Sequence, residues 1–217
     1  LLKSENGWLR DRAQQILLLR QDKSVVSDLE KLVFERKNEV TSIHALHTLN
    51  GLQALSFALV RRAAVEGSAM LSSHALVLLQ AFAPNHAEAM ATLAKQLLTR
   101  NDSTINLYLA ATLGPWNQSS QEMFFPVLQT LSGMYADNGV YQEAIVSSVA
   151  NVENDFRKAL SGSGKRQFSR TLDTLLSHVI KNRQEGKLNP IFVQEPRPMD
   201  ARTNGIELFR KNCASCH

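Results

Sequence analysis

The stretch VTSIHALHTLNG, residues 40–51, indicates the fold class of this chain. Its larger apolar residues recur every three or four positions, as expected for one face of an α-helix: Val40, Ile43, Leu46 and Leu49. Gly51 follows the last of them, and glycine is frequent at the C-terminal ends of helices. The stretch therefore predicts one amphipathic helix that ends at Gly51.

The same spacing runs through nearly all of the chain before residue 187. Eleven segments of about 9 to 17 residues show it, separated by short stretches of polar residues, glycine or proline. Asn6 is expected to cap the first segment through its side chain. The predicted helices are 7–20, 26–33, 40–51, 52–65, 68–82, 87–98, 103–113, 121–135, 141–149, 152–160 and 166–182.

Helices this short do not bury an apolar face alone and must pack against neighbours. Their pairs are expected to recur about every 35 to 40 residues, which favours an α-solenoid of HEAT-like or armadillo-like helix pairs. Residue-for-residue similarity between the pairs is weak, and a compact helical bundle is the alternative. The sequence therefore predicts an all-α fold, with the solenoid preferred over the bundle.

Three prolines mark a change of character near the C-terminal end of the chain: Pro190, Pro196 and Pro198. Proline lacks a backbone donor and disfavours helix in the residue before it, so an extended linker is expected over 187–203. The linker divides a helical-repeat domain, 1–186, from one last helix, 204–217. Because the chain begins at a leucine and ends at a histidine, it is expected to be an interior piece of a longer polypeptide.

The composition, 44% apolar and 20% charged, is that of an ordinary globular protein. No apolar run approaches the roughly 18 residues that a membrane helix needs, so no membrane span is expected in this chain. Eight basic residues lie between 157 and 187, opposed by two acidic ones, Asp173 and Glu185. They fit a solvated helix face best; an acidic partner or anionic lipid is an alternative, and nucleic acid the weakest one, since Phe168 is the stretch's sole aromatic residue.

The motif with chemical content is NCASCH, residues 212–217. Cys-x-x-Cys-His is the pattern at which haem c is attached, because two thiols bind the porphyrin and the histidine ligates the iron. On a helix, Cys213, Cys216 and His217 share one face. Half of a zinc site and a dithiol redox pair are the alternatives. Covalent haem c is predicted, incomplete or absent in this piece alone because the rest of a haem pocket would lie beyond residue 217.

No catalytic residue is assigned in the helical part, since no nucleophile elbow, phosphate loop or paired carboxylate pattern occurs in it. His44 and His47 lie one turn apart, and they are interpreted as helix-interface residues because metal sites need about three converging ligands. The remaining histidines of this part, His74, His86 and His178, are interpreted as isolated.

Two separated regions carry a family resemblance. NGWLRDRAQQILLLRQDKSVVSDLEKL, followed by IHALHTLNGL and, at the other end, GIELFRKNCASCH, resembles large haem-binding proteins of Planctomycetes, Verrucomicrobia and Bacteroidetes. These proteins are often labelled membrane-bound dehydrogenases. They contain a β-propeller like that of sugar dehydrogenases, a HEAT-repeat solenoid and a c-type cytochrome domain that opens with Cys-x-x-Cys-His.

The resemblance implies that Cys213 and Cys216 anchor the haem and that His217 is the proximal ligand of its iron. It implies a scaffold or spacer in a periplasmic or cell-surface protein that passes electrons from a sugar or alcohol dehydrogenase domain to a cytochrome domain and then to an acceptor protein. It also implies that Trp8 packs between helices, and that Arg10 or Asp11 fixes the loop before the first helix. The alternative is a helical-repeat protein-interaction module without redox function.

Overall fold

The computed structural model describes residues 1–35, 37–118, 120–162 and 169–187. These residues form α-helices and two short 3-10 helices, and no strand occurs among them. The predicted all-α class is therefore confirmed. By its contacts the chain divides into two compact units, Leu1–Ile180 and Lys181–His217, and the packing described below is that of the first unit.

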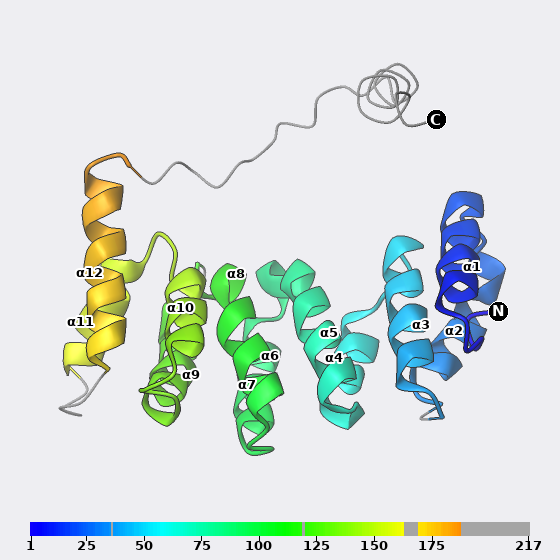
Figure 1. Ribbon diagram of the computed structural model, residues 1–217, viewed down its shortest axis with the longest axis horizontal. Coiled ribbons are helices and arrows are strands. Elements are labelled where there is room, and N and C mark those ends of the chain that lie inside the picture. The colour runs from blue at the N-terminus through cyan, green and yellow to red at the C-terminus, as the bar shows by residue number, and fades with distance from the viewer. Residues whose placement is uncertain (36, 119, 163–168, 188–217) are drawn as a thin grey trace. The chain divides into compact units, whose positions relative to one another are not determined.

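The described part of the chain contains twelve α-helices (Figure 1). The prediction of eleven missed the four-residue α8, and the segment expected at 68–82 becomes 3-10 helix, Gln80–Asn85, in its last turn. The helices are α1 Gly7–Arg20, α2 Val26–Val33, α3 Glu39–Gly51, α4 Phe57–Glu66, α5 Ala69–Leu79, α6 Ala87–Leu98, α7 Ser103–Thr112, α8 Gly114–Asn117, α9 Gln121–Met134, α10 Gly139–Ser148, α11 Glu153–Gly162 and α12 Arg170–Gln184.

After α1, the chain forms successive pairs, each of a first helix (α2, α4, α6, α9, α11) and a second helix (α3, α5, α7, α10, α12). The first helices begin at residues 26, 57, 87, 121 and 153, so the pairs recur every 30 to 34 residues. The expected spacing of about 35 to 40 residues was therefore too long. Most of these helices have only 8 to 14 residues and short links join them, which shortens the repeat.

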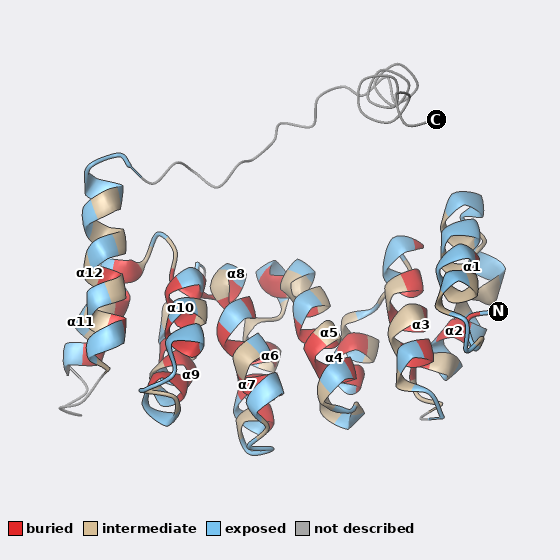
Figure 2. Ribbon diagram, viewed as in Figure 1, coloured by how far each residue is buried: buried red, intermediate tan, exposed pale blue. Residues whose placement is uncertain are grey.

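The helices pack in two rows. In one row α1 contacts α3, α3 contacts α5, α5 contacts α7, and α7 contacts α10. In the other, α4 contacts α6, α6 contacts α9, and α9 contacts α11. Buried residues lie between the rows (Figure 2), and the largest of them include Trp116, Phe124 and Phe156.

The second helices share a sequence pattern, which we call their register. Its positions are counted from the residue that precedes each helix, so the fourth position is the residue four places further on. All five of these preceding residues cap their helix by accepting a backbone N–H bond: Asn38, Ser68, Asp102, Asn138 and Ser169. Seven residues further on, every second helix has a fully buried aliphatic side chain: Ala45, Ala75, Leu109, Ile145 and Leu176.

A polar residue occupies the fourth position of this register in every second helix: Ser42, Ser72, Asn106, Gln142 and Asp173. The Ser72 hydroxyl donates to the carbonyl of Ala64, in the last turn of α4, at 2.8 Å. The Gln142 amide likewise donates to the carbonyl of Tyr135, which follows α9, at 2.7 Å. Because the last carbonyls of a helix have no partner inside it, these side chains tie α5 to the end of α4 and α10 to the end of α9.

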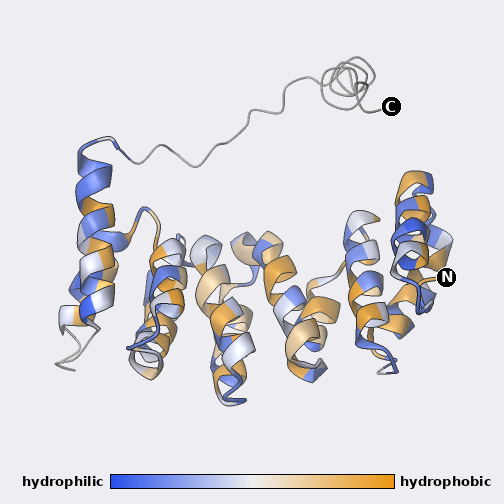
Figure 3. Cartoon of the chain, in the orientation of Figure 1, coloured by the Kyte–Doolittle hydropathy of each residue, from blue (hydrophilic) through white to orange (hydrophobic). Residues whose placement is uncertain are grey.

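α12 differs from the other second helices in its last turns, which are hydrophilic (Figure 3). The second unit, as far as the structure describes it, consists of the end of α12 and the turn to Lys187. Among the described residues, no helix has the length and apolar character needed to cross a bilayer.

Candidate functional site

The predicted haem-attachment residues Cys213, Cys216 and His217 lie outside the described residues. The same holds for the predicted last helix, 204–217, and for the linker apart from Lys187. Haem attachment therefore stays a prediction from the sequence.

The described part offers a different surface, formed by the second helices α3, α5, α7 and α10. These four helices contain only two Asp, Glu, Lys or Arg residues, Glu39 and Glu143. Their outer surface, which we call the neutral face, also carries apolar and aromatic side chains that are 38% to 60% exposed: Val40, Met70, Val77, Tyr108 and Val140. An uncharged surface with exposed apolar groups is typical of protein interaction sites.

Three histidines lie on the neutral face, and two of them contact each other. The Nε2 atom of His47, on α3, lies 2.9 Å from the Nδ1 atom of His74, on α5. The two rings are nearly perpendicular, with their centroids 5.0 Å apart. The interpretation of His47 as a helix-interface residue is confirmed, whereas the interpretation of His74 as isolated was wrong.

His44 joins α3 to α1. Its Nδ1 atom lies 2.7 Å from Oε1 of Gln14, and its Nε2 atom lies 3.8 Å from a carboxylate oxygen of Asp11. Both partners are on α1, so His44 is also an interface residue, as predicted. His86, which was interpreted as isolated, stacks on Phe57 with ring centroids 4.0 Å apart.

Burial sets the protonation of two of these histidines. Partial burial lowers the pKa of His47, and the nearby His74 and His44 lower it further. Burial also lowers the pKa of His44; the Asp11 carboxylate opposes this effect and Arg10 adds to it. Both imidazoles are therefore mainly neutral at pH 7, with a nitrogen lone pair available on each.

The segment before α1 is held by Arg10. Its guanidinium donates to the backbone carbonyls of Ser4 and Glu5 at 2.7 and 2.9 Å, which confirms the role predicted for Arg10. Trp8, however, does not pack between helices: it is 62% exposed, and the guanidinium of Arg12 lies over its ring. The ring, in the first turn of α1, pairs with Arg12 of the same helix.

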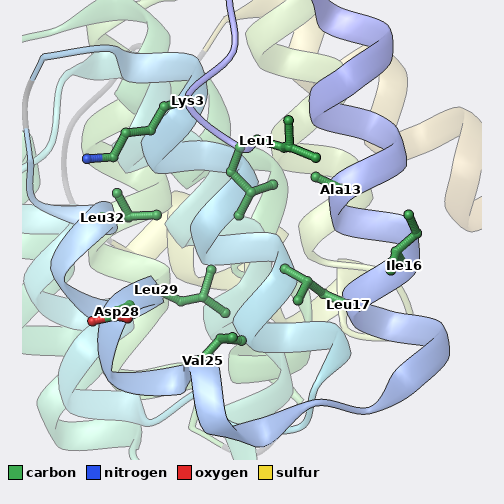
Figure 4. A pocket seen from close by; sticks show the side chains of 10 residues that line it. Leu1, Lys3, Ala13, Ile16, Leu17, Val25, Asp28, Leu29 and Leu32 are labelled. Carbon is green, nitrogen blue, oxygen red and sulfur yellow. The ribbon is translucent and has the colours of Figure 1, made fainter.

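An apolar pocket of about 440 Å³ lies between α1, α2 and the first residues of the chain (Figure 4). Its walls are aliphatic, and the charged residues among those that line it are Lys3 and Asp28. Such a lining offers van der Waals contact, whereas a binding or catalytic site also needs converging polar groups. The pocket was not predicted, because residues 1–32 meet there only through folding.

The basic stretch 157–187 is partly neutralised. Arg157 forms an ion pair with Asp173 at 2.8 Å, and Lys158 one with Asp155 at 3.5 Å. Lys181 lies 3.9 Å from Glu185. Lys165 and Arg166 are outside the described residues. These pairs agree with the interpretation of a solvated helix face.

Within the described ranges, no group of three or more His, Cys, Asp or Glu side chains is arranged to hold a metal ion. Comparison of the chain with protein-family models, curated proteins and solved structures gave no match. The family resemblance therefore rests on the sequence motifs alone.

Proposed function

We propose that this chain is the helical-repeat scaffold of a c-type haem protein, with haem attached at its C-terminal end. The observation that carries the proposal is the motif of Cys213, Cys216 and His217. The two thiols would form thioether bonds to the haem, and the imidazole would ligate its iron from one side.

The repeated pairing of the helices supports a scaffold role. Four of the five second helices contact a counterpart in the neighbouring pair, from α3 to α5, α7 and α10. This packing supports an α-solenoid, in which stacked pairs form an extended support. In the proposed assembly the support stands between a propeller dehydrogenase domain and a cytochrome domain in the periplasm or at the cell surface, and electrons pass on to an acceptor protein.

Haem attachment is tested by producing the full-length natural protein that contains this chain, which we call the parent protein, together with the bacterial haem-maturation proteins. We expect a haem absorption band that survives acid–acetone extraction, because thioether bonds are covalent. Changing both Cys213 and Cys216 to Ala should remove it, while the matched variant Ser215→Ala should keep it. A parent protein without extraction-resistant haem would contradict the proposal.

A second candidate function, protein interaction without redox chemistry, is favoured by the neutral face. Four helices present almost no charge there, although α4 in the other row carries Arg61, Arg62 and Glu66. A photo-crosslinking residue placed at Val77 should give one discrete protein adduct in cells. The same residue at Thr92, exposed on α6, is the control; equal adducts from both positions, or none from Val77, would count against this function.

A further inference from the structure

The geometry of the contact between His47 and His74 suits a shared metal ion as well as a hydrogen bond. Their facing nitrogens are 2.9 Å apart and come from two different helix pairs. In such a contact one nitrogen carries a proton and the other accepts it, so a single proton holds the two imidazoles together.

A divalent metal ion could take the place of that proton. Metal–imidazole bonds are about 2.0–2.1 Å long, so two ligand nitrogens in adjacent coordination positions lie about 2.9–3.4 Å apart. The observed separation is within this range. Binding would then require small ring rotations that direct both lone pairs at one point, with no movement of α3 or α5.

The surrounding helices carry few positive charges that would repel a metal ion. His47 is half-buried, so part of its ring stays accessible to solvent. α5 has no lysine or arginine, and the charged residue of α3 is an acid, Glu39. On α1, the carboxylate of Asp11 faces His44, next to the pair, and Arg10 is the nearby cation.

We propose that His47 and His74 together bind one divalent first-row transition-metal ion, such as Zn²⁺ or Cu²⁺. Imidazole is a preferred ligand of both ions. Water fills the remaining coordination positions, because the described part of the chain has no cluster of three protein ligands. The ion joins consecutive helix pairs across the neutral face, and its ligands are different residues from those of the proposed haem site.

The test is a calorimetric titration with zinc chloride. The chain should carry Cys213→Ser and Cys216→Ser throughout, since these thiols are themselves zinc ligands. We expect saturable binding with one Zn²⁺ per chain, which is lost in His47→Gln and in His74→Gln. Two matched variants should keep it: His44→Gln, one turn away on α3, and His86→Gln, whose ring stacks on Phe57.

Two further readouts separate the metal site from a loss of folding. Circular dichroism shows whether each variant keeps its helices. Zinc should raise the melting temperature of the parent, here the chain with both cysteines changed to serine, but not that of the His47 or His74 variants. With Cu²⁺, the electron paramagnetic resonance spectrum should show coupling to two imidazole nitrogens. Absence of saturable binding by the parent, or equal binding by folded His47→Gln and His74→Gln, would overturn the proposal.

Discussion

The two rows of helices solve the same packing problem with different surfaces. α4 and α5 each bury one side in the common core, yet α4 has three charged residues and α5 has none. The low charge is shared by α3, α5, α7 and α10, whereas α12 carries four charged residues. This makes the neutral face of those four helices the candidate for binding.

The sharpest way to test this division is to compare two neighbours on α5. Leu76 is fully buried, whereas Val77 is 40% exposed on the neutral face. Leu76→Ala should lower the free energy of unfolding by about 2–5 kcal/mol, because it leaves a cavity in the core. Val77→Ala should change it by about 0.5 kcal/mol or less. Urea unfolding monitored by circular dichroism measures both; equal losses would mean that Val77 belongs to the core.

The next effect concerns the joint between the two rows. Gln142, fully buried on α10, donates to the carbonyls of Tyr135 and Ser132 at the end of α9. Gln142→Ala should lower the free energy of unfolding by about 1–3 kcal/mol, because it leaves buried carbonyls without a donor.

Glu143, the next residue and an exposed one, provides the matched control for Gln142. Glu143→Ala should be nearly neutral in the same urea experiment. If the two substitutions had equal effects, the joint would not depend on the polar residue at the fourth position.

A smaller effect is expected for a joint made from the surface. The guanidinium of Arg100, in the link after α6, donates to the carbonyl of Gly67 at 3.0 Å and to the Ser72 hydroxyl at 2.9 Å. Solvent screens this exposed residue, so Arg100→Ala should cost about 1 kcal/mol. Lys95→Ala on α6 should lower the free energy of unfolding by less. Thermal unfolding of both variants should be repeated at high salt. An effect of Arg100→Ala that persists there comes from the hydrogen bonds, and one that disappears comes from the charge.

The smallest effect is a dependence of stability on pH that comes from the α1–α3 contact. Burial lowers the pKa of His44 below its ordinary value of 6.5, so the unfolded chain takes up this proton at a higher pH than the folded chain does. The stabilisation of the folded state by neutral His44 is therefore fully present above pH 6.5. It is lost as the pH falls through the pKa that His44 has in the folded chain.

The melting temperature of the parent should therefore decrease between pH 7.5 and 5.5, measured with a chelator present. The decrease should be smaller in His44→Gln, which keeps a polar partner for Gln14. An identical decrease in both proteins would show that other groups set the pH dependence.

Local features of the fold could be predicted from the sequence, and non-local ones could not. Asn6 caps α1 and Gly51 ends α3, as expected, because capping and periodicity are written in adjacent residues. The four-residue α8 was missed because it is too short for periodicity to show and because Gly114 and Pro115 indicate a helix end. The His47–His74 contact was missed because it joins residues 27 positions apart.

The common register of the second helices illustrates the same limit. The fourth position holds a serine, an asparagine, a glutamine or an aspartate, so comparison by residue identity does not detect the repeat. Comparison by chemical class would have found it: a capping residue, a polar residue four positions later and an aliphatic one seven positions later. The helix pairs therefore resemble one another in the chemical class of the residue at each position and not in its identity.

The contacts of the helices have a consequence for how the molecule comes apart. α5 packs against α3, α4 and α7, and the main contacts of the other helices are similarly confined to near neighbours in the chain. When residues 1–217 are produced by themselves, an array of this kind should lose its order from the ends, since each outer helix pair then contacts one other pair only. Amide hydrogen exchange should therefore be slowest in α5 and α7 and should quicken toward α1 and α11. A metal ion that joined α3 to α5 should slow amide exchange in these two helices. Exchange in the helices further along the array should not change.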